Sequence, residues 1–352
     1  MDKVIKFYKN KKIFITGHTG FKGSWLTSTL ISFGAKVCGY SLKDEKLKMY
    51  KKICNSNKVI NMYGDILDFK KLNNSLIKFR PSIIFHLAAQ SIVSDSYINP
   101  VKTFKTNFSG TLNILEISKN LPSLRSLIIV TSDKCYENIN KNNNYKKEGD
   151  KLNGDDPYSA SKASAEILFN AYRKSFFVKN SRLGTATVRA GNVIGGGDMS
   201  KDRLIPDCIK SLKNKKYLTI RNPLAIRPWQ HVLDVTNGYL ILGKYLYDMP
   251  KKNSGSWNFA PNKKSYNVKK IVNLLFKSLR KRKKIKIKPS NFKEKFNLIV
   301  NAEKARKNLK WKSKLSIQNG IKLTSLWYLE FLNKKNTIKF TSSQINNFFD
   351  IK

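Results

Sequence analysis

The stretch that decides the fold is KIFITGHTGFKG, residues 12–23. Its first five residues form an apolar run typical of a buried strand, and a helical pattern with Trp25, Leu26 and Leu30 follows it. Between the two, glycines recur with the spacing GxxGxxG. Glycine suits a turn that is too tight for a side chain, and the amino end of the following helix offers free N–H groups and a positive dipole to a pyrophosphate. The stretch therefore predicts a dinucleotide site with contacts from Gly17, Thr19, Gly20, Phe21, Lys22 and Gly23.

Short apolar runs alternate with helical patterns through the first half of the chain. Further strands are predicted at 35–40, 58–63, 81–87 and 126–130, with a helix over 106–120. Continuous apolar strands separated by helices favour a parallel sheet that is covered on both faces. The predicted fold class is therefore α/β, with a doubly wound parallel Rossmann sheet.

The second half of the chain is less regular. Beyond Gly191 come Gly195-Gly196-Gly197 and several prolines, which predict a smaller C-terminal lobe that closes over a substrate. The predicted division is 1–190 for the Rossmann domain and 191–352 mainly for the substrate-binding lobe, with about 225–250 returning to the Rossmann domain. Residues 138–155 are polar and predict a surface loop.

The composition is that of a globular protein with an unusual charge. Of its 352 residues, 68 are Lys or Arg and 23 are Asp or Glu, which gives a formal net charge of +45. A basic face can bind nucleic acid. Here the lysines are spread along the chain and are not gathered beside aromatic side chains. We therefore expect a lysine-coated surface and no nucleic-acid partner.

The cysteines and histidines are few and scattered. They are Cys38, Cys54, Cys135, Cys208, His18, His86 and His231. Without a CxxC pair or a cluster of ligands, no metal is expected. The first residues have no apolar core of a signal peptide, and no run approaches the length of a membrane span. We expect a cytoplasmic protein without a membrane partner.

A tyrosine and a lysine four residues apart lie on one face of a helix, where the ammonium stabilises a phenolate and makes the tyrosine an acid/base. This spacing occurs at Tyr8/Lys12, Tyr158/Lys162, Tyr247/Lys251 and Tyr266/Lys270. Only Tyr158 and Lys162 begin a helix downstream of a strand, and that strand ends near Ser132. The set of Ser132, Tyr158 and Lys162 predicts hydride transfer to or from an alcohol carbon.

The choice of dinucleotide is open on residue chemistry alone. The second strand ends Gly39-Tyr40-Ser41, without the carboxylate that usually binds the adenosine ribose of NAD. Both NAD and NADP are therefore compatible with it. Asp65 follows the third strand, where its carboxylate can meet the adenine amino group or simply hold a turn.

Several motifs resemble the extended short-chain dehydrogenase/reductases, and within them the branch of CDP-glucose 4,6-dehydratases. They are Thr16–Trp25 (TGHTGFKGSW), His86–Gln90 (HLAAQ), Thr131–Tyr136 (TSDKCY), Asp156–Lys162 (DPYSASK), Val188–Asp198 (VRAGNVIGGGD), Ile226–Val232 (IRPWQHV) and Trp257–Phe259 (WNF). The resemblance covers essentially the whole chain. It implies NAD as the cofactor, with further contacts from Ile66, Leu87, Ala88, Ala89 and Asn107.

The resemblance also implies the roles of the two residues that follow Ser132. Lys134 removes the proton from C5 of an oxidised sugar, and Asp133 protonates the departing 6-hydroxyl. The implied substrate is CDP-glucose, the product is a 4-keto-6-deoxy sugar of deoxysugar biosynthesis, and the implied assembly is a homodimer.

Substrate contacts are predicted from residue type and from motif. Arg203 and Arg227 suit a diphosphate because guanidinium binds phosphate oxygens bidentately. Asn192 and Asn258 lie in motifs of the family and are expected to contact the substrate. Three departures from the family pattern bear on substrate contacts: Ser94 where an arginine is common, Lys293-Glu294 in place of His-Glu, and Leu309-Lys310-Trp311 in place of Leu-Gly-Trp.

Two other functions compete with a dehydratase. A nucleotide-sugar 4-epimerase on the same scaffold needs the tyrosine and lysine but no elimination pair, so Asp133 and Lys134 discriminate against it. A basic nucleic-acid-binding protein on a vestigial Rossmann fold is a candidate of another class. The intact set of Ser132, Tyr158 and Lys162 argues against this nucleic-acid-binding hypothesis.

Overall fold

The computed structural model describes residues 2–137, 145–214, 217–261, 266–288 and 299–351. Of the sequence predictions, Lys293 and Glu294 and residues 138–144 of the expected loop lie outside these ranges.

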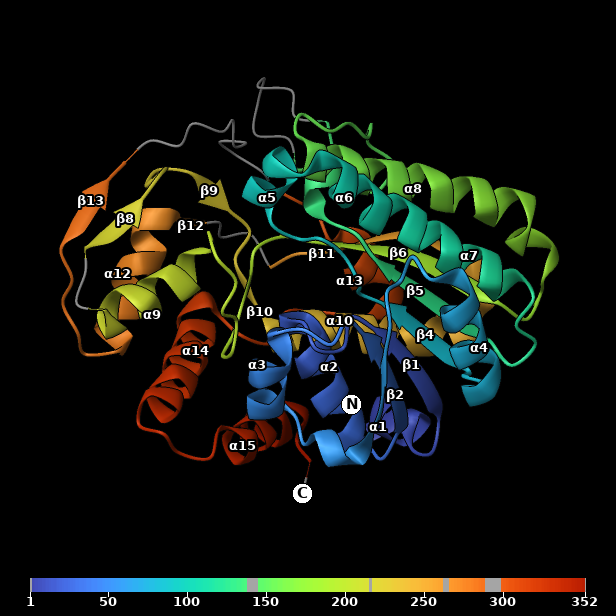
Figure 1. The fold of residues 1–352 in the computed structure, drawn as a ribbon, viewed down its shortest axis with the longest axis horizontal. Helices are drawn as coiled ribbons and strands as arrows, with labels where there is room; N and C mark the ends of the chain where they lie inside the picture. Colours follow the sequence, from blue (N-terminus) through green and yellow to red (C-terminus); the bar gives the residue numbers. More distant parts are fainter. Residues whose placement is uncertain (1, 138–144, 215–216, 262–265, 289–298, 352) are drawn as a thin grey trace.

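Seven parallel strands form the central sheet (Figure 1). They are β1 (Lys12–Thr16), β2 (Lys36–Ser41), β3 (Val59–Tyr63), β4 (Ile83–His86), β5 (Ser126–Val130), β6 (Gly184–Ala190) and β11 (Gly255–Phe259). Their order across the sheet is β11-β6-β5-β4-β1-β2-β3, and every neighbouring pair is parallel. The strand order reverses between β1 and β4, as in a doubly wound fold. The predicted fold class is confirmed.

The alternation of side chains along β1 builds a core on each face of the sheet. Ile13 and Ile15 pack in one apolar cluster with Trp25 of α2 (Phe21–Ser32) and Leu240 of α10 (Val232–Asp248). Phe14 points the other way. It packs in a second cluster to which α4 (Phe69–Phe79), α7 (Gly110–Lys119) and α8 (Pro157–Ser175) contribute. The sheet is therefore covered on both faces, as its continuous apolar strands predict.

The remaining elements complete the Rossmann half and form the lobe on the left of Figure 1. Helices are α1 (Asp2–Tyr8), α3 (Lys46–Ile53), α5 (Val93–Ile98), α6 (Pro100–Phe104), α9 (Leu204–Lys213), α11 (Pro250–Asn253), α12 (Val268–Ser278), α13 (Glu303–Leu309), α14 (Ile317–Leu332) and α15 (Thr337–Phe349). Short helical turns are η1 (Ser56–Lys58), η2 (Lys105–Ser109), η3 (Asp133–Cys135) and η4 (Phe177–Lys179). Short strands are β7 (Val193–Ile194), β8 (Leu218–Ile220), β9 (Ile226–Arg227), β10 (Gln230–His231), β12 (Tyr266–Asn267) and β13 (Ile285–Ile287).

The chain returns to the Rossmann half twice. Strand β11 pairs with β6 in the main sheet and lies beyond the range 225–250 that the sequence analysis returns to this domain. Helix α15 packs near α2 and α3, where Phe349 meets Phe33 edge to face at 5.0 Å between ring centroids. Thr337 also donates a hydrogen bond to the carbonyl of Lys52. The division at residue 190 stays a prediction about domains, but these contacts place parts of the last hundred residues on the first half.

Candidate active site

A cleft with a volume of about 270 Å³ lies between the Rossmann half and the lobe, beside the ends of β5 and β6. The parallel sheet brings the carboxyl ends of its strands to one edge, where ligands of such folds bind. Of the predicted site residues, the cleft is lined by Phe21, Lys22, Ser132, Asp133, Lys134, Tyr158, Asn192, Arg203 and Arg227. One cavity therefore joins the end of the glycine turn, the acid/base candidates and the predicted substrate arginines.

The glycine turn is packed too closely for side chains. Gly17 has a φ of 71°, and a Cβ built there would lie 2.7 Å from the amide nitrogen of Ala88. A Cβ on Gly23 would lie 2.2 Å from the carbonyl oxygen of Gly17. Helix α2 then begins at Phe21, and no side chain caps its amino end at Gly20. The open first turn of α2 fits the pyrophosphate of a dinucleotide, which binds to such N–H groups.

Hydrogen bonds fix the residues at the carboxyl ends of β2 and β3. Thr19 donates a hydrogen bond to the Ser41 hydroxyl at 3.2 Å, and the Tyr40 hydroxyl donates to the carbonyl of Asp65 at 3.1 Å. The carboxylate of Asp65 accepts from the amide of Leu67 at 2.9 Å, so it holds a turn. This is the simpler of its two predicted roles, and an adenine contact stays a prediction.

The predicted cofactor contacts after β4 surround the same turn. Leu87, Ala88 and Ala89 follow the strand directly. Asn107 is buried behind them, where its amide donates to the carbonyl of Gln90 at 3.0 Å and to Ser161 at 2.8 Å. Ile66 is also buried, against Gly110 of α7. Asn107 therefore links the turn after β4 to α8, and neither it nor Ile66 lines the cleft.

Tyr158 lies at the start of α8, where the local sequence fixes it. Asp156 caps the helix by accepting from the amide of Ser159 at 2.9 Å, and Pro157 occupies the first turn. Ser96 accepts a hydrogen bond from the Tyr158 amide at 3.1 Å. Burial raises the pKa of Tyr158 to about 12, against a hydrogen bond with Ser132 and the charge of Arg203, which lower it.

Lys162 lies one helical turn further along α8 and is 5% exposed. Its ammonium donates to the carbonyl of Val130, at the end of β5, at 3.2 Å. Burial lowers the pKa of Lys162 to about 8, and the charge of Glu166 opposes this. Tyr158 and Lys162 are four residues apart on α8 and share a helix face, and a cation near a phenol favours the phenolate, so the pair can move a proton.

The predicted elimination pair follows β5 as a short helical turn, η3. The Ser132 hydroxyl accepts from the amide of Lys134 at 3.2 Å and lies 3.2 Å from a carboxylate oxygen of Asp133. Asp133 is 4% exposed, while Lys134 is partly exposed at the cleft. The turn thus presents three different polar groups to one cavity within three residues.

Positive charge is concentrated at the same cleft. Lys22 is close to Arg203 and Lys162, and burial together with these two cations lowers its pKa to about 7. The guanidinium of Arg203 pairs with Asp198 at 3.0 Å and donates to Ser91 at 3.2 Å. Such a field attracts an anionic substrate.

The cleft also contains residues that the sequence analysis did not select. Arg221 and Asp202 line it, and Ser94 donates to the Asp202 carboxylate at 2.6 Å. At the position where an arginine is common in the family, this chain therefore has Ser94, which is hydrogen-bonded to another residue of the cleft lining, Asp202. Arg221 lies outside the quoted motifs, and its residue type was the one available signal.

Asn258 requires a correction, because the structure does not place it at the cleft. It is fully buried in β11. Its side-chain oxygen accepts from the Tyr136 hydroxyl at 2.8 Å, and its amide donates to the carbonyls of Lys146 and Asn301 at 3.2 and 3.1 Å. These partners satisfy the amide inside the protein, so it serves the packing of three segments rather than a substrate.

The described residues contain no group of three or more His, Cys, Asp and Glu side chains arranged to hold a metal ion. Nor does any helix among them combine the length and apolar character that crossing a bilayer requires.

This chain is similar to known 4,6-dehydratases and 4-epimerases of nucleotide sugars. A family model described as GDP-mannose 4,6 dehydratase matches residues 14–324. The CDP-glucose 4,6-dehydratase of Salmonella typhimurium is 46% identical over 260 residues, which are 72% of either chain. The UDP-glucose 4-epimerase of Mycoplasma genitalium is 26% identical over 92% of this chain and 97% of its own.

Two solved structures show the same fold at low identity. Epimerase Mth375 of Methanothermobacter thermautotrophicus has a TM-score of 0.83 at 21% identity and covers 94% of this chain and 96% of its own. The dTDP-glucose 4,6-dehydratase of Bacillus anthracis, in complex with NAD, has a TM-score of 0.78 at 23% identity and covers 93% and 99%. From the family match and the 46% identical relative, the chain belongs to the GDP-mannose 4,6 dehydratase family and is an NAD-dependent 4,6-dehydratase of the extended short-chain dehydrogenase/reductase type.

Proposed function

We propose that this enzyme converts CDP-D-glucose to CDP-4-dehydro-6-deoxy-D-glucose by internal oxidation, loss of water and reduction. The observation that carries the proposal is the single cleft in which Ser132 and Tyr158 meet Asp133 and Lys134. The first two suit alcohol oxidation, and the second two suit elimination from the neighbouring carbons. The choice of cytidine is supported by the 46% identity to the Salmonella typhimurium enzyme.

The first step is removal of the proton from the sugar's 4-hydroxyl by Tyr158. Its phenol is buried and hydrogen-bonded with Ser132, and Lys162 lies one turn away on the same helix face. The lysine's cation stabilises the phenolate, while Ser132 orients the 4-hydroxyl. When bound, NAD supplies the hydride acceptor at C4 and later the hydride donor at C6. The glycine turn and the open amino end of α2 are the proposed pyrophosphate site.

The second step belongs to Asp133 and Lys134. A ketone at C4 acidifies the hydrogen at C5, and Lys134 in its neutral form removes it. Asp133 in its protonated form donates a proton to the leaving 6-hydroxyl, which departs as water. Because both residues lie on one short turn beside Ser132, they can reach carbons next to the one that Tyr158 serves.

The substrate's diphosphate is proposed to bind between Arg203 and Arg227, with Asn192 beside the sugar-proximal phosphate or sugar. All three side chains line the cleft. Arg203 already pairs with Asp198 at 3.0 Å, so a phosphate would share or replace a carboxylate as its partner.

A 4-epimerase of the same fold is not favoured. Epimerisation needs the tyrosine and lysine alone, whereas Asp133 and Lys134, the residues proposed for elimination, also line this cleft. A nucleic-acid-binding protein on a vestigial scaffold is not favoured either, because Ser132 and Tyr158 line one cleft and Lys162 lies one turn along the same helix.

The test follows one hydrogen. CDP-glucose with deuterium at C4 is turned over in ordinary water, and the product is analysed by NMR and mass spectrometry. A dehydratase places the label in the new methyl group at C6 of the same molecule, with a solvent hydrogen at C5. Label that stays at C4 would indicate an epimerase, and label on released NADH would indicate a simple dehydrogenase. Either result refutes the proposal.

We further propose a homodimer formed through α5, α6 and α8. These helices expose Ile98, Val101 and Ile167, which are 76%, 62% and 61% exposed. These three helices contact one another, and exposed apolar side chains that adjoin in one patch mark an interface. Sedimentation should give a dimer, and Val101→Asp should shift it toward the monomer. A wild-type monomer at micromolar concentration would contradict this assembly.

We also propose a cytoplasmic location and no nucleic-acid partner. All four cysteines are buried as thiols, which fits a reducing compartment. Retention of the protein on immobilised DNA or RNA at physiological salt would contradict the second part.

A further inference from the structure

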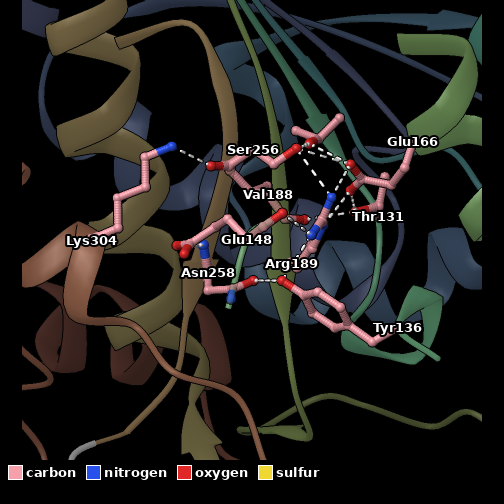
Figure 2. Close-up of polar contacts among 10 residues, drawn as sticks. Thr131, Tyr136, Glu148, Glu166, Val188, Arg189, Ser256, Asn258 and Lys304 are labelled. Atoms are coloured by element: carbon pink, nitrogen blue, oxygen red, sulfur yellow. Dashed lines mark hydrogen bonds and ion pairs between the residues drawn. The ribbon is translucent and has the colours of Figure 1, made fainter. Parts of the chain in front are cut away.

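A buried ion pair lies between β6 and α8 (Figure 2), beside residues 132–135, which we call the catalytic turn. Arg189 and Glu166 are 1% and 0% exposed. They meet in bidentate geometry, with the guanidinium Nε at 2.9 Å and Nη2 at 2.7 Å from the two carboxylate oxygens. Neither residue lines the cleft.

On one side, the pair holds the residue that precedes the catalytic turn. The hydroxyl of Thr131 donates to Oε1 of Glu166, and the hydroxyls of Thr187 and Ser256 donate to Oε2 at 2.8 and 3.2 Å. Thr131 is followed directly by Ser132. Glu166 itself lies one helical turn beyond Lys162 on α8. The carboxylate therefore connects the start of the turn to the helix that carries the tyrosine and lysine.

On the other side, the pair holds the residue that follows the turn. The guanidinium of Arg189 donates to the hydroxyl of Tyr136 at 2.8 Å and stacks on its ring at 4.8 Å. It also donates to the carbonyl of Glu148 at 3.2 Å. In Figure 2, Tyr136 lies below the guanidinium, while Thr131 lies to its right beside Glu166. Residues 132–135 thus lie between two anchors that share one ion pair.

Stability alone does not account for an ion pair at this place. Burying two charges is costly, and apolar side chains of similar volume often replace such pairs without loss of stability. What the pair provides here is geometry, because fixed hydrogen bonds locate both ends of a turn and the neighbouring helix. A shift of about 1 Å in a reacting group is enough to slow a reaction by about 100-fold.

We propose that Glu166 and Arg189 are positioning residues for the reaction, which hold the turn 132–135 in register with Tyr158 and Lys162. The inference rests on the proposed function, since it takes those residues to act on the sugar. It also has an electrostatic consequence at Lys162. That ammonium is faced by Glu166 on α8, by Cys135 on η3, by His86 on β4 and by Lys22 on α2. Glu166 raises the pKa of Lys162 against the effect of burial.

The test compares three variants of the NAD-bound enzyme with the wild type. Glu166→Gln keeps the shape and removes the charge. The double variant Glu166→Leu with Arg189→Met replaces the pair by apolar side chains. Asp234→Asn is the matched control, because Asp234 is a fully buried carboxylate that accepts from Ser313 and Lys314 away from the cleft. The measurements are kcat, KM, thermal unfolding, and the pH dependence of NADH formation in a single turnover.

We expect Glu166→Gln and the double variant to lose about 100-fold in kcat with little change in KM. In both, the alkaline limb of the pH profile should move to lower pH, because Lys162 loses the anion that favours its charged form. Asp234→Asn should lower the unfolding temperature without moving that limb. A wild type that forms no 4-keto product would instead contradict the proposed function itself.

Three results would overturn the positioning role while leaving the function intact. One is an unchanged pH limb with a kcat loss no larger than that of Asp234→Asn. Another is a folded double variant with wild-type kcat. The third is failure of both Glu166 variants to fold, which would make the pair a requirement of the fold alone.

Discussion

Removing the hydroxyl of Tyr158 tests the catalytic assignment most directly. The phenol is 8% exposed, and burial raises its pKa to about 12. At about pH 7 a group with that pKa keeps its proton in nearly every molecule, so removal of the 4-hydroxyl proton depends on the cation of Lys162 to favour the phenolate. Tyr158→Phe removes this phenol and leaves Ser132 as the remaining hydroxyl of the proposed oxidation set in the cleft.

The expected loss in kcat is therefore near the upper end of the range for general acid/base groups, about 10⁴-fold, or about 5 kcal/mol in activation free energy. The cost in folding free energy should be much smaller. One hydrogen bond with Ser132 is lost, and such a bond contributes about 1 kcal/mol.

The assay is NADH formation in a single turnover with CDP-glucose, together with calorimetric titration of NAD. Tyr247→Phe is the matched control. Tyr247 also precedes a lysine by four residues, but it lies at the end of α10 against Phe7. Near-normal turnover by Tyr158→Phe, or an equal loss in the control, would refute the assignment.

Three further predictions test other parts of the molecule. Lys134→Ala should accumulate bound NADH and a 4-keto glucose while water loss slows; a variant that never reduces its NAD would move Lys134 to the oxidation step. Since the pKa of Lys22 is lowered to about 7, the anionic NAD should raise it on binding, so at about pH 8 binding takes up a proton. Calorimetry in buffers of different ionisation enthalpy measures this, and Lys22→Met should take up none. Phe349→Ala should lower the free energy of unfolding by about 3–5 kcal/mol because the ring is fully buried, whereas the exposed Phe69→Ala should change it by about 0.5 kcal/mol or less, both measured by urea unfolding.

The sheet was predictable because its signals are local. Apolar runs and the glycine turn act over a few residues, and five of the seven strands follow from them. The helix predicted over 106–120 is more complex, since the π-helical turn η2 precedes α7. Strand β11 was outside the predicted return of the chain, because its place beside β6 depends on pairing with residues about seventy positions earlier.

Site residues could be predicted where their spacing in the sequence indicates their chemical role. They could not be predicted where their hydrogen-bond partners are far away in the sequence. Tyr158 and Lys162 share a helix face, and the structure brings the tyrosine to a cleft with Ser132. Asn258 was assigned to the substrate from its motif alone, but its partners are Tyr136, Lys146 and Asn301, which no local pattern joins to it.

The ion pair of Glu166 and Arg189 was also missed, although two signals were present. Glu166 lies four residues after Lys162, on the same face of the helix. Arg189 interrupts a buried strand, and a buried arginine requires an acceptor. Together these two signals indicate a buried ion pair. They do not indicate its hydrogen bonds to Thr131 and Tyr136, the residues on either side of the catalytic turn.

The contact between Phe33 and Phe349 has a consequence for the order in which the protein forms during translation. Helix α2 ends at Ser32 and emerges from the ribosome well before α15, which packs on it and begins only at Thr337. Chains grow at about 5–20 residues per second, and domains generally fold as units once their sequence is complete. The nascent amino-terminal half must therefore wait with an apolar helix surface uncovered, and with β6 lacking its neighbour β11. Transiently exposed apolar surface of this kind is prone to aggregate, so the interval before α15 is made is when a chaperone would protect the chain.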